Sequence, residues 1–325
     1  MLQQTQMERG VAYFRRWIGR FPDVQSVADA DEQEILKYWE GLGYYARARN
    51  LHRAAKAIAG ELGGIVPCDY GELRRLPGIG PYTAAAIASV AGNHDVAAVD
   101  ANVTRVYARI FDISVPVKSK DGQGKIQALA ESLLPRGRAR AYNQALMDLG
   151  GLVCTPKAPR CEACPIARSC QARQAGAVAE RPVASEKKKI VTLRKVAGII
   201  RHRDRIYIQR RRADDVWGGL WEFPGGEHTA ENPKNEVASA IAGETGLVVR
   251  VIEELPVIIH HYTCYKIILH SFLCELQGND RPRLRKAVDF RWVQSTEIGG
   301  YAFPAGPRKL LERLGESLSE MLVSA

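Results

Sequence analysis

Four cysteines are crowded into a short, proline-rich stretch of this 325-residue chain. Cys154, Cys161, Cys164 and Cys170 follow the spacing C-x6-C-x2-C-x5-C. Thiolates at that density suit one compact site with four ligands. Structural zinc usually takes two CxxC pairs, and only Cys161 and Cys164 form one here, so the spacing favours a [4Fe–4S] cluster. A disulfide framework is the weaker alternative, because the chain is large and its other cysteines are scattered.

One aspartate stands where a carboxylate could act on a substrate. The segment VDANVTRV (99–106) puts Asp100 at the expected N-cap of a helix. Its carboxylate could accept the free N–H groups of the first turn, and that capping role alone would explain the residue. Capping and chemistry are therefore equal alternatives at this point.

The segment LPGIGPY (76–82) predicts an anion site between two helices. Gly78 and Gly80 let the backbone approach a surface closely, and Pro81 suits the first residue of a helix. Unpaired N–H groups at that helix N-terminus would attract a DNA phosphate. A tight turn that binds nothing is the alternative. The flanking helices and the preceding proline favour a helix-hairpin-helix.

Composition indicates a polyanionic partner. The formal net charge is +10 and the isoelectric point is about 9.3. Each lysine or arginine that neutralises a phosphate releases counterions, which favours nucleic acid. No apolar run approaches the roughly 18 residues that a membrane-spanning helix needs. The length and the 46% hydrophobic content are typical of two globular domains.

The elements that must position these residues change in character near residue 176. Before it, helical spacing dominates; after it come runs of β-branched residues with helices between them. Helices are expected at 31–40, 44–59, 70–76, 83–91, 102–111, 233–242 and 307–322, and strands at 196–200, 206–208, 247–252, 257–259 and 267–273.

This pattern predicts a multidomain chain. An all-α helix-hairpin-helix domain with a cluster loop (154–170) occupies residues 1–175, and an α/β domain occupies residues 191–325. Residues 176–190 have no apolar periodicity and end in three lysines, which predicts an exposed linker.

The order of these motifs resembles the endonuclease III superfamily of DNA glycosylases, and in particular the MutY family of adenine glycosylases. The resemblance extends over nearly the whole chain. The segments that carry it, besides the cysteine run, are MLQQTQ (1–6), GLGYYARARNLH (41–52), LPGIGPYTA (76–84), VDANVTRV (99–106), NQALMDLGGLVC (143–154), WGGLWEFPGG (217–226) and YAFP (301–304).

The resemblance implies removal of adenine mispaired with 8-oxoguanine or guanine from double-stranded DNA, in base excision repair. It implies a monomer with a [4Fe–4S] cluster, in the cytoplasm of a bacterial cell and associated with the nucleoid. Gln4 and Tyr44 match the residues that wedge into the duplex near the lesion, and Leu2 and Thr5 fall in the same segment. A mispair lowers the cost of extruding the target base.

The resemblance also assigns the chemistry. Hydrolysis passes through an oxocarbenium-like state that needs an acid for the leaving base and an anion beside the sugar. Asp100 matches the anion, while Tyr82 and Asn102 match positions that support the sugar cation and its water. Bifunctional relatives carry a lysine where this chain has Tyr82, because a Schiff base requires an amine. The resemblance therefore implies a monofunctional hydrolase.

The second carboxylate of the family's pattern falls outside this sequence. The general-acid glutamate lies just upstream of the segment that begins here at Met1. Loss of a positioned general acid lowers the rate by about 10²- to 10⁴-fold. Two hypotheses follow: an adenine glycosylase whose start was assigned too late, which we favour, or a catalytically dead protein that binds DNA lesions.

The second half resembles the MutT-like, Nudix-fold domain that this family uses to recognise 8-oxoguanine. Of a working Nudix box it keeps Glu231 and Glu244 and lacks most of the metal carboxylates, which implies binding without hydrolysis. The reading loop would be His260 to Cys264, with Tyr262 and Thr263 as the recognition residues. A β-hairpin that packs only on its own sheet is the alternative.

Overall fold

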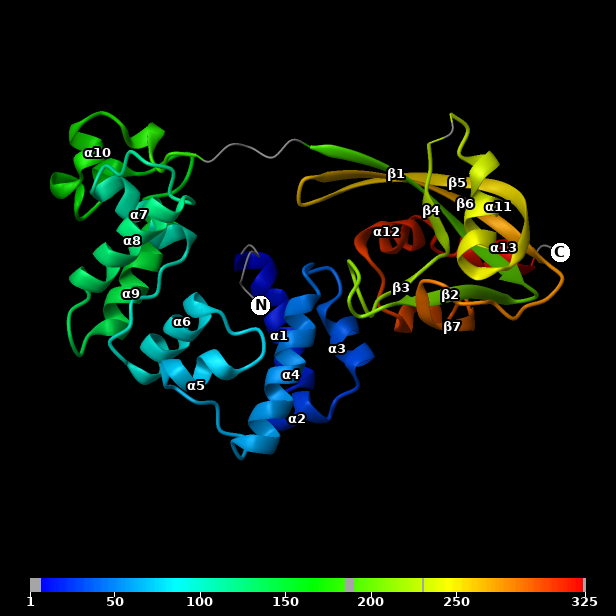
Figure 1. Ribbon diagram of the computed structural model, residues 1–325, viewed down its shortest axis with the longest axis horizontal. Coiled ribbons are helices and arrows are strands. Elements are labelled where there is room, and N and C mark those ends of the chain that lie inside the picture. The colour runs from blue at the N-terminus through cyan, green and yellow to red at the C-terminus, as the bar shows by residue number, and fades with distance from the viewer. Residues whose placement is uncertain (1–6, 185–189, 230, 324–325) are drawn as a thin grey trace. The chain divides into compact units, whose positions relative to one another are not determined.

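The structure is a computed structural model that describes residues 7–184, 190–229 and 231–323 (Figure 1). Contacts between residues divide the chain into two compact units. The helical unit is Ala57–Lys187, and the sheet unit combines Met1–Lys56 with Lys188–Ala325. Sequence motifs suggested a division near residues 176–190, but packing also joins the N-terminal helices to the C-terminal sheet.

The first half of the chain is helical, as predicted. No helix in the described ranges is long and apolar enough to cross a membrane. The helices are α1 (Met7–Arg20), α2 (Val24–Asp29), α3 (Glu32–Trp39), α4 (Ala46–Glu61), α5 (Tyr70–Arg75), α6 (Pro81–Gly92), α7 (Ala101–Ile110), α8 (Lys120–Leu133), α9 (Ala139–Asp148) and α10 (Gln171–Gln174), with a π-helical turn, η1, at Leu149–Val153.

Local signals set the start of α6 and of α7. Pro81 is the first residue of α6, and Asn93 ends that helix in the left-handed conformation. Asp100 is the N-cap of α7 and accepts a hydrogen bond from the Val103 N–H. The core of the helical unit lies beside them, where α7, α8 and α9 bury residues such as Val106, Ile126 and Leu146.

The second half forms an α/β domain, which confirms the predicted fold class. Within the described residues, seven strands make one mixed sheet in the order β3-β2-β1-β6-β5, with β4 paired to β1 and β7 paired to β2. Only the β1–β6 pair is parallel among these strands. The strands are β1 (Val191–His202), β2 (Arg205–Arg211), β3 (Trp221–Glu222), β4 (Gly225–Glu227), β5 (Val248–Tyr262), β6 (Tyr265–Gln277) and β7 (Ala287–Gln294).

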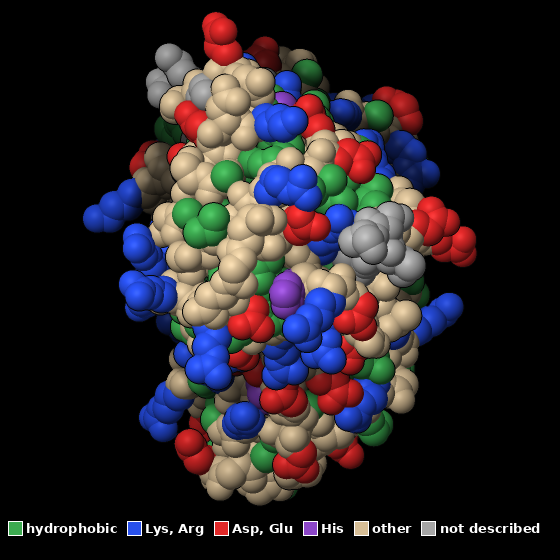
Figure 2. Space-filling view, turned by 90° about the vertical axis from the view of Figure 1, so that its right-hand side faces the viewer, with side chains coloured by type: hydrophobic (Ala, Val, Ile, Leu, Met, Phe, Trp, Pro, Cys, Tyr) green, Lys and Arg blue, Asp and Glu red, His purple; other side chains and the backbone are tan. Residues whose placement is uncertain are grey.

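Helices cover both faces of the sheet. On one face α11 (Lys234–Thr245) buries Val237 and Ile241 against β1 and β6. On the other face α12 (Ala305–Leu314) and α13 (Ser317–Val323) bury leucines such as Leu310 against Ile199. The surface that Figure 2 shows mixes basic and acidic side chains, so the net positive charge is not gathered there.

Two details of the second half differ from the sequence prediction. The two strands expected at 247–252 and 257–259 are one strand, β5, whose pairing with β6 shifts between Leu255 and Ile258. The helix expected at 307–322 is divided into α12 and α13 at Gly315, whose φ is +49°. A strand tolerates irregular pairing when it continues on both sides, and glycine readily adopts a positive φ.

The N-terminal helices join the sheet unit through buried polar contacts. The Glu40 carboxylate accepts hydrogen bonds from the Phe303 N–H at 2.8 Å and from Arg308 Nε at 2.7 Å. The Trp221 indole N–H donates to Gln33 Oε1 at 2.7 Å. The Glu40 side chain is only 13% exposed. These contacts fix the loop after α3, which carries Tyr44, to the sheet.

The first part of the predicted linker is held against the helical unit. Residues 178–180 form a short 3₁₀ turn. Arg109 donates to the Val178 and Arg181 carbonyls at 3.1 and 2.9 Å, and the Arg181 guanidinium pairs with Asp112 at 2.8 Å. Absence of apolar periodicity therefore did not mean absence of structure, because polar contacts order this segment.

Candidate functional site

The hairpin between α5 and α6 has the backbone that the glycines predicted. Gly78 has a φ of +75°, which a glycine adopts without strain. Gly80 is the N-cap of α6 and has no side chain to cover the helix terminus. Arg74 Nη1 donates to the Ile79 carbonyl at 2.8 Å and closes the turn. The N-terminus of α6 is thus available to an anion such as a phosphate.

The three residues predicted to be catalytic lie at two helix N-termini of the helical unit. Asp100 Oδ1 accepts the Val103 N–H at 2.7 Å, and Asp100 Oδ2 accepts the Asn102 amide at 3.0 Å. Tyr82, near the start of α6, is 36% exposed. Burial, and then the charge of Asp100, raise the pKa of Tyr82, so its hydroxyl stays protonated beside the carboxylate.

A buried arginine supports Asn102 from behind. Arg105 is 7% exposed. Its guanidinium donates to Asn102 Oδ1 at 2.9 Å, to the Gly150 carbonyl at 2.7 Å and to the Cys154 carbonyl at 2.7 Å. A hydrogen-bonded path therefore runs from Asp100 through Asn102 and Arg105 to the first cysteine.

Close packing of η1 on the start of α7 completes this arrangement. A Cβ added at Gly150 would lie 2.6 Å from Asn102 Cβ, which is far inside van der Waals contact. Only glycine fits there. The π-helical turn therefore approaches Asn102 closely enough for the Gly150 carbonyl to meet Arg105.

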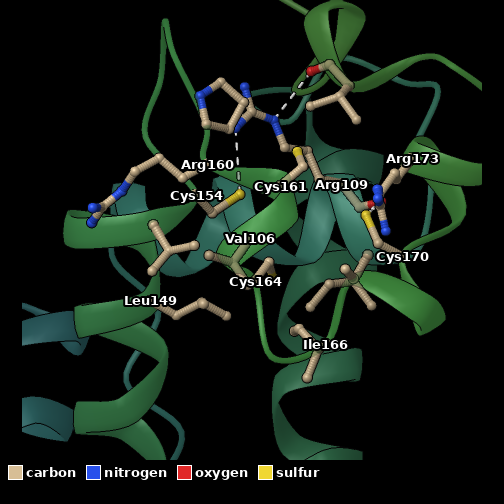
Figure 3. Close-up of a pocket in the computed structure, with 15 residues that line it drawn as sticks. Val106, Arg109, Leu149, Cys154, Arg160, Cys161, Cys164, Ile166, Cys170 and Arg173 are labelled. Atoms are coloured by element: carbon tan, nitrogen blue, oxygen red, sulfur yellow. Dashed lines mark hydrogen bonds between the residues drawn. The ribbon is translucent and has the colours of Figure 1, made fainter.

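The four cysteines line one pocket, as Figure 3 shows. They come from the end of η1, two 3₁₀ turns and the start of α10, and none is in a disulfide. In the described part of the chain, no three His, Cys, Asp or Glu side chains are close enough to hold a single metal ion. A [4Fe–4S] cluster keeps its thiolates further apart than one zinc ion does. Four thiols around a common pocket fit the cluster.

Arg109 organises the cysteine segment. It is 3% exposed, and α7 places it one turn after Arg105. Besides the two carbonyls near residue 180, its guanidinium donates to the Thr155 carbonyl at 2.8 Å and the Pro156 carbonyl at 3.1 Å. It also donates to Cys154 Sγ at 3.4 Å, as Figure 3 shows. The Arg109 guanidinium thus ties the start of the cysteine segment to the chain that follows the segment.

The predicted wedge and reading residues lie together in the sheet unit. The rings of Tyr44 and Tyr262 have centroids 6.1 Å apart. Tyr262 ends β5, and Thr263 and Cys264 form the two-residue turn to β6. The reading loop is therefore a β-hairpin, but Tyr262 also contacts residues outside its own sheet. Leu2, Gln4 and Thr5 lie outside the described residues.

The remnant of the Nudix box is built into the fold. Glu244, one of the two glutamates that the chain keeps, is on α11. Glu244 is buried and accepts the Gly225 N–H at 2.8 Å. Nearby, Glu222 is paired with Arg211; burial raises the pKa of Glu222 and the guanidinium opposes that shift. These carboxylates have partners within the protein.

Sequence reasoning did not identify Arg105, Arg109, Gly150, Glu40 or Trp217. The first two could have been found, because they are four residues apart on the helix that Asp100 begins, and a buried face with two arginines needs acceptors. The partners of Gly150, Glu40 and Trp217 are distant in sequence, and no local signal indicates them.

Comparison with known proteins finds matches to two domain families and to curated relatives. Residues 1–136 match the HhH-GPD superfamily of base excision DNA repair proteins, and residues 195–313 match the NUDIX domain. The adenine DNA glycosylase of Buchnera aphidicola subsp. Schizaphis graminum is 34% identical over 224 residues, which are 69% of this chain and 65% of that protein. The Homo sapiens adenine DNA glycosylase is 41% identical over 175 residues, 54% of this chain and 32% of that protein.

Among solved structures, a thermostable thymine-DNA glycosylase aligns with a TM-score of 0.48 and 29% identity, over 54% of this chain and 80% of that one. The family models and the curated relatives confirm the resemblance seen in the sequence. The chain carries a domain of the HhH-GPD superfamily of base excision DNA repair proteins in its first part and a NUDIX domain after it. It is similar in sequence to adenine DNA glycosylases, and it spans 65% of the length of the Buchnera protein.

Proposed function

We propose that this protein is a monofunctional adenine DNA glycosylase, which hydrolyses the N-glycosidic bond of adenine mispaired with 8-oxoguanine or guanine. The observation that supports it most is the Asp100 carboxylate, whose two oxygens are held by the Val103 N–H and the Asn102 amide beside Tyr82. An anion fixed in this way can stabilise an oxocarbenium-like sugar without reorganising during the reaction.

The residues around Asp100 fit the roles that this chemistry needs. Once adenine is extruded from the duplex, the sugar would lie beside Asp100 and the attacking water near Asn102. Tyr82 keeps its proton and has no amine, so it cannot form a Schiff base with the opened sugar. The N-terminus of α6, which begins one residue before Tyr82, would bind a phosphate of the same strand.

We also propose that the four cysteines hold a [4Fe–4S] cluster. Their common pocket, their thiol chemistry and the Arg109 contact to Cys154 Sγ support it. When bound, the cluster would supply four strong bonds that close the cysteine segment. The cysteine segment would position Asn102 through Arg105, which donates both to the Cys154 carbonyl and to Asn102 Oδ1. Asp100 and a general acid would carry out the hydrolysis itself.

The test uses duplexes with a single adenine opposite 8-oxoguanine, guanine or thymine, under single-turnover conditions. We expect adenine release opposite 8-oxoguanine and guanine and none opposite thymine. The DNA strand should break only after alkali, and borohydride should trap no covalent adduct. Strand cleavage without alkali, or an adduct in good yield, would show that the monofunctional assignment is wrong.

The general acid can be tested separately. The family's pattern puts it two residues before Met1, so a chain extended by Glu-Ala should release adenine about 10²- to 10⁴-fold faster than one extended by Gln-Ala. If both extended chains bind an 8-oxoguanine mispair and neither releases adenine, the lesion-binding hypothesis is correct and the glycosylase proposal is not.

A further inference from the structure

Strained backbone is concentrated at one place in the sheet unit. Among the described residues, non-glycine residues with positive φ are Tyr44, Asn93, Asp112, Arg203, Trp217 and Thr263. Asparagine and aspartate adopt this conformation comparatively easily, but a tryptophan or a β-branched threonine seldom does. Tyr44 (φ 49°), Trp217 (φ 60°) and Thr263 (φ 53°) all lie around the ring of Tyr262 or next to it in sequence.

The three aromatic rings at this place are in mutual contact through Tyr262. The Trp217 and Tyr262 centroids are 5.3 Å apart with the planes at 65°, and Tyr44 approaches Tyr262 at 6.1 Å. We call Tyr44, Trp217 and Tyr262 the aromatic cluster. Its members come from the loop before α4, the loop after β2 and the tip of β5, so three separate segments converge.

The loop that carries Trp217 is held in place from two sides. Gly218 is buried so tightly that an added Cβ would lie 2.5 Å from the Ala213 carbonyl oxygen. Arg49, on α4, donates hydrogen bonds to the Gly218 and Ala213 carbonyls. A positive φ at a tryptophan persists only where the surroundings enforce it, and such positions gather at functional sites.

The aromatic cluster is not an ordinary packed core. Tyr44 is 40% exposed, and Trp217 and Tyr262 are half-buried. Two cations border the rings: the Arg47 guanidinium lies 5.7 Å from the Tyr44 centroid, and Lys195 Nζ lies 6.0 Å from that of Trp217. Accessible ring faces flanked by positive charge suit a nucleobase and the phosphates on either side of it.

We propose that Trp217 is a third recognition residue, whose ring contacts the purine opposite the mispaired adenine together with Tyr262 and Tyr44. The inference rests on the proposed function and extends it. Trp221, in the same segment, is packed in the sheet core and is 2% exposed, whereas Trp217 is half-buried. Arg49 acts as a positioning residue, because it holds the strained loop through two backbone carbonyls.

The positive φ at Trp217 offers a matched test. Trp217→Gly removes the ring and leaves a residue that adopts this backbone conformation without strain, so the melting temperature should not fall. Trp217→Phe keeps an aromatic ring. Trp292→Phe, at an aromatic site on β7 away from the reading loop, is the control. Affinity is measured for duplexes with 8-oxoguanine or guanine opposite a non-cleavable adenine analogue, and adenine release is measured on the cleavable pair.

Wild type, Trp217→Phe and Trp292→Phe should prefer 8-oxoguanine over guanine to a similar degree. Trp217→Gly should lose roughly fivefold or more of that preference in affinity, the low end of what stacking on one aromatic ring contributes. A lowered melting temperature with an unchanged preference would show a purely structural role and overturn the inference. So would a wild-type protein that does not distinguish the two bases.

These results separate the two proposals. The first outcome is that neither wild type nor the Glu-Ala extended chain releases adenine, while both prefer 8-oxoguanine in affinity and Trp217→Gly loses that preference. This outcome would overturn the glycosylase proposal and support recognition of the base by Trp217. Normal adenine release with an unchanged preference in Trp217→Gly would overturn only the inference about Trp217.

Discussion

The helical unit and the sheet unit hold the side chains that we propose to be functional by different means. In the helical unit, Asp100 and Asn102 are fixed by hydrogen bonds that lead to the buried Arg105. In the sheet unit, Trp217 and Thr263 are fixed by strained backbone and by contacts between segments. Hydrogen bonds to a guanidinium set positions to within fractions of an ångström, as chemistry requires. Ring contacts leave more freedom, which suits recognition.

The comparison predicts different responses to substitution. Loss of the arginine contacts of the helical unit should lower its unfolding free energy or the rate of adenine release, because buried carbonyls and Asn102 lose fixed partners. Damage to the aromatic cluster should change which base is preferred and leave the rate of bond breaking intact. The sheet unit has its own buried polar contact, Glu40 with Arg308, and this contact should behave like those of the helical unit.

The largest expected effect is at Arg109. Arg109→Met keeps most of the side-chain length and leaves the carbonyls of Thr155, Pro156 and Val178 without their donor. We expect the helical unit to lose at least about 3 kcal/mol of unfolding free energy in urea denaturation, and the visible absorbance of an iron–sulfur protein to be weakened. Arg160→Met, in the same segment but exposed, should change stability by less than about 1 kcal/mol. Equal effects of the two variants would contradict the role given to Arg109.

Glu40→Gln should have the next largest effect. The carboxylate accepts hydrogen bonds from Arg308 Nε, the Phe303 N–H and Lys37 Nζ. A neutral amide cannot accept from all three donors. We expect a loss of about 2–3 kcal/mol from the sheet unit, measured by thermal or urea unfolding. Glu34→Gln breaks an exposed pair with Arg20 on the neighbouring helix and should cost less than about 1 kcal/mol. A larger loss of stability in Glu34→Gln than in Glu40→Gln would contradict the role given to Glu40.

Arg105→Lys tests whether Asn102 must be held. Lysine keeps the charge but cannot donate to Asn102, Gly150 and Cys154 with one planar fork. Adenine release should slow by about 10- to 100-fold, while affinity for the mispair stays close to that of wild type. Exposed Arg136→Lys is the control. An unchanged rate of adenine release in Arg105→Lys would show that the cysteine segment does not influence catalysis through Arg105.

The smallest expected effect is a dependence of stability on pH in the sheet unit. Burial, and then the charges of Lys309, His261 and Lys195, lower the pKa of His260 to about 4. The unfolded chain therefore takes up a proton below its ordinary pKa of about 6.5, and the folded chain does not. The unfolding free energy should therefore fall by about 1–2 kcal/mol as the pH is lowered from 7 to 5. His260→Gln should flatten this slope, and exposed His94→Gln should keep it.

Local signals explain what the sequence could predict. Pro81 at the start of α6, Asp100 at the N-cap of α7 and Gly78 in the hairpin each act within a few residues, so the pattern alone indicates their conformation. The change from helical spacing to β-branched runs likewise predicted an all-α part followed by an α/β domain. The spacing of the cysteines predicted one site, and they line one pocket.

What the sequence could not give depends on partners far along the chain. Arg105 reaches a carbonyl 49 residues away, and Glu40 reaches Arg308 across 268 residues. The positive φ of Trp217 follows from the packing of Gly218 and from Arg49, and no propensity of tryptophan indicates it. Packing of the N-terminal helices against the sheet has the same origin, because it joins the two ends of the sequence.

The most direct test of this division of roles combines two substitutions. Asp100→Asn keeps a good helix cap and removes the negative charge, and Trp217→Gly removes one ring. Both, singly and together, are assayed for adenine release and for affinity with 8-oxoguanine or guanine opposite the adenine. We predict that Asp100→Asn slows adenine release opposite either base by about 10²-fold or more. The variant should still bind the duplex with 8-oxoguanine more tightly than the duplex with guanine. Trp217→Gly should lose that preference and retain release opposite guanine. Equal loss of release opposite both bases in Trp217→Gly, or substantial release by Asp100→Asn, would contradict the account.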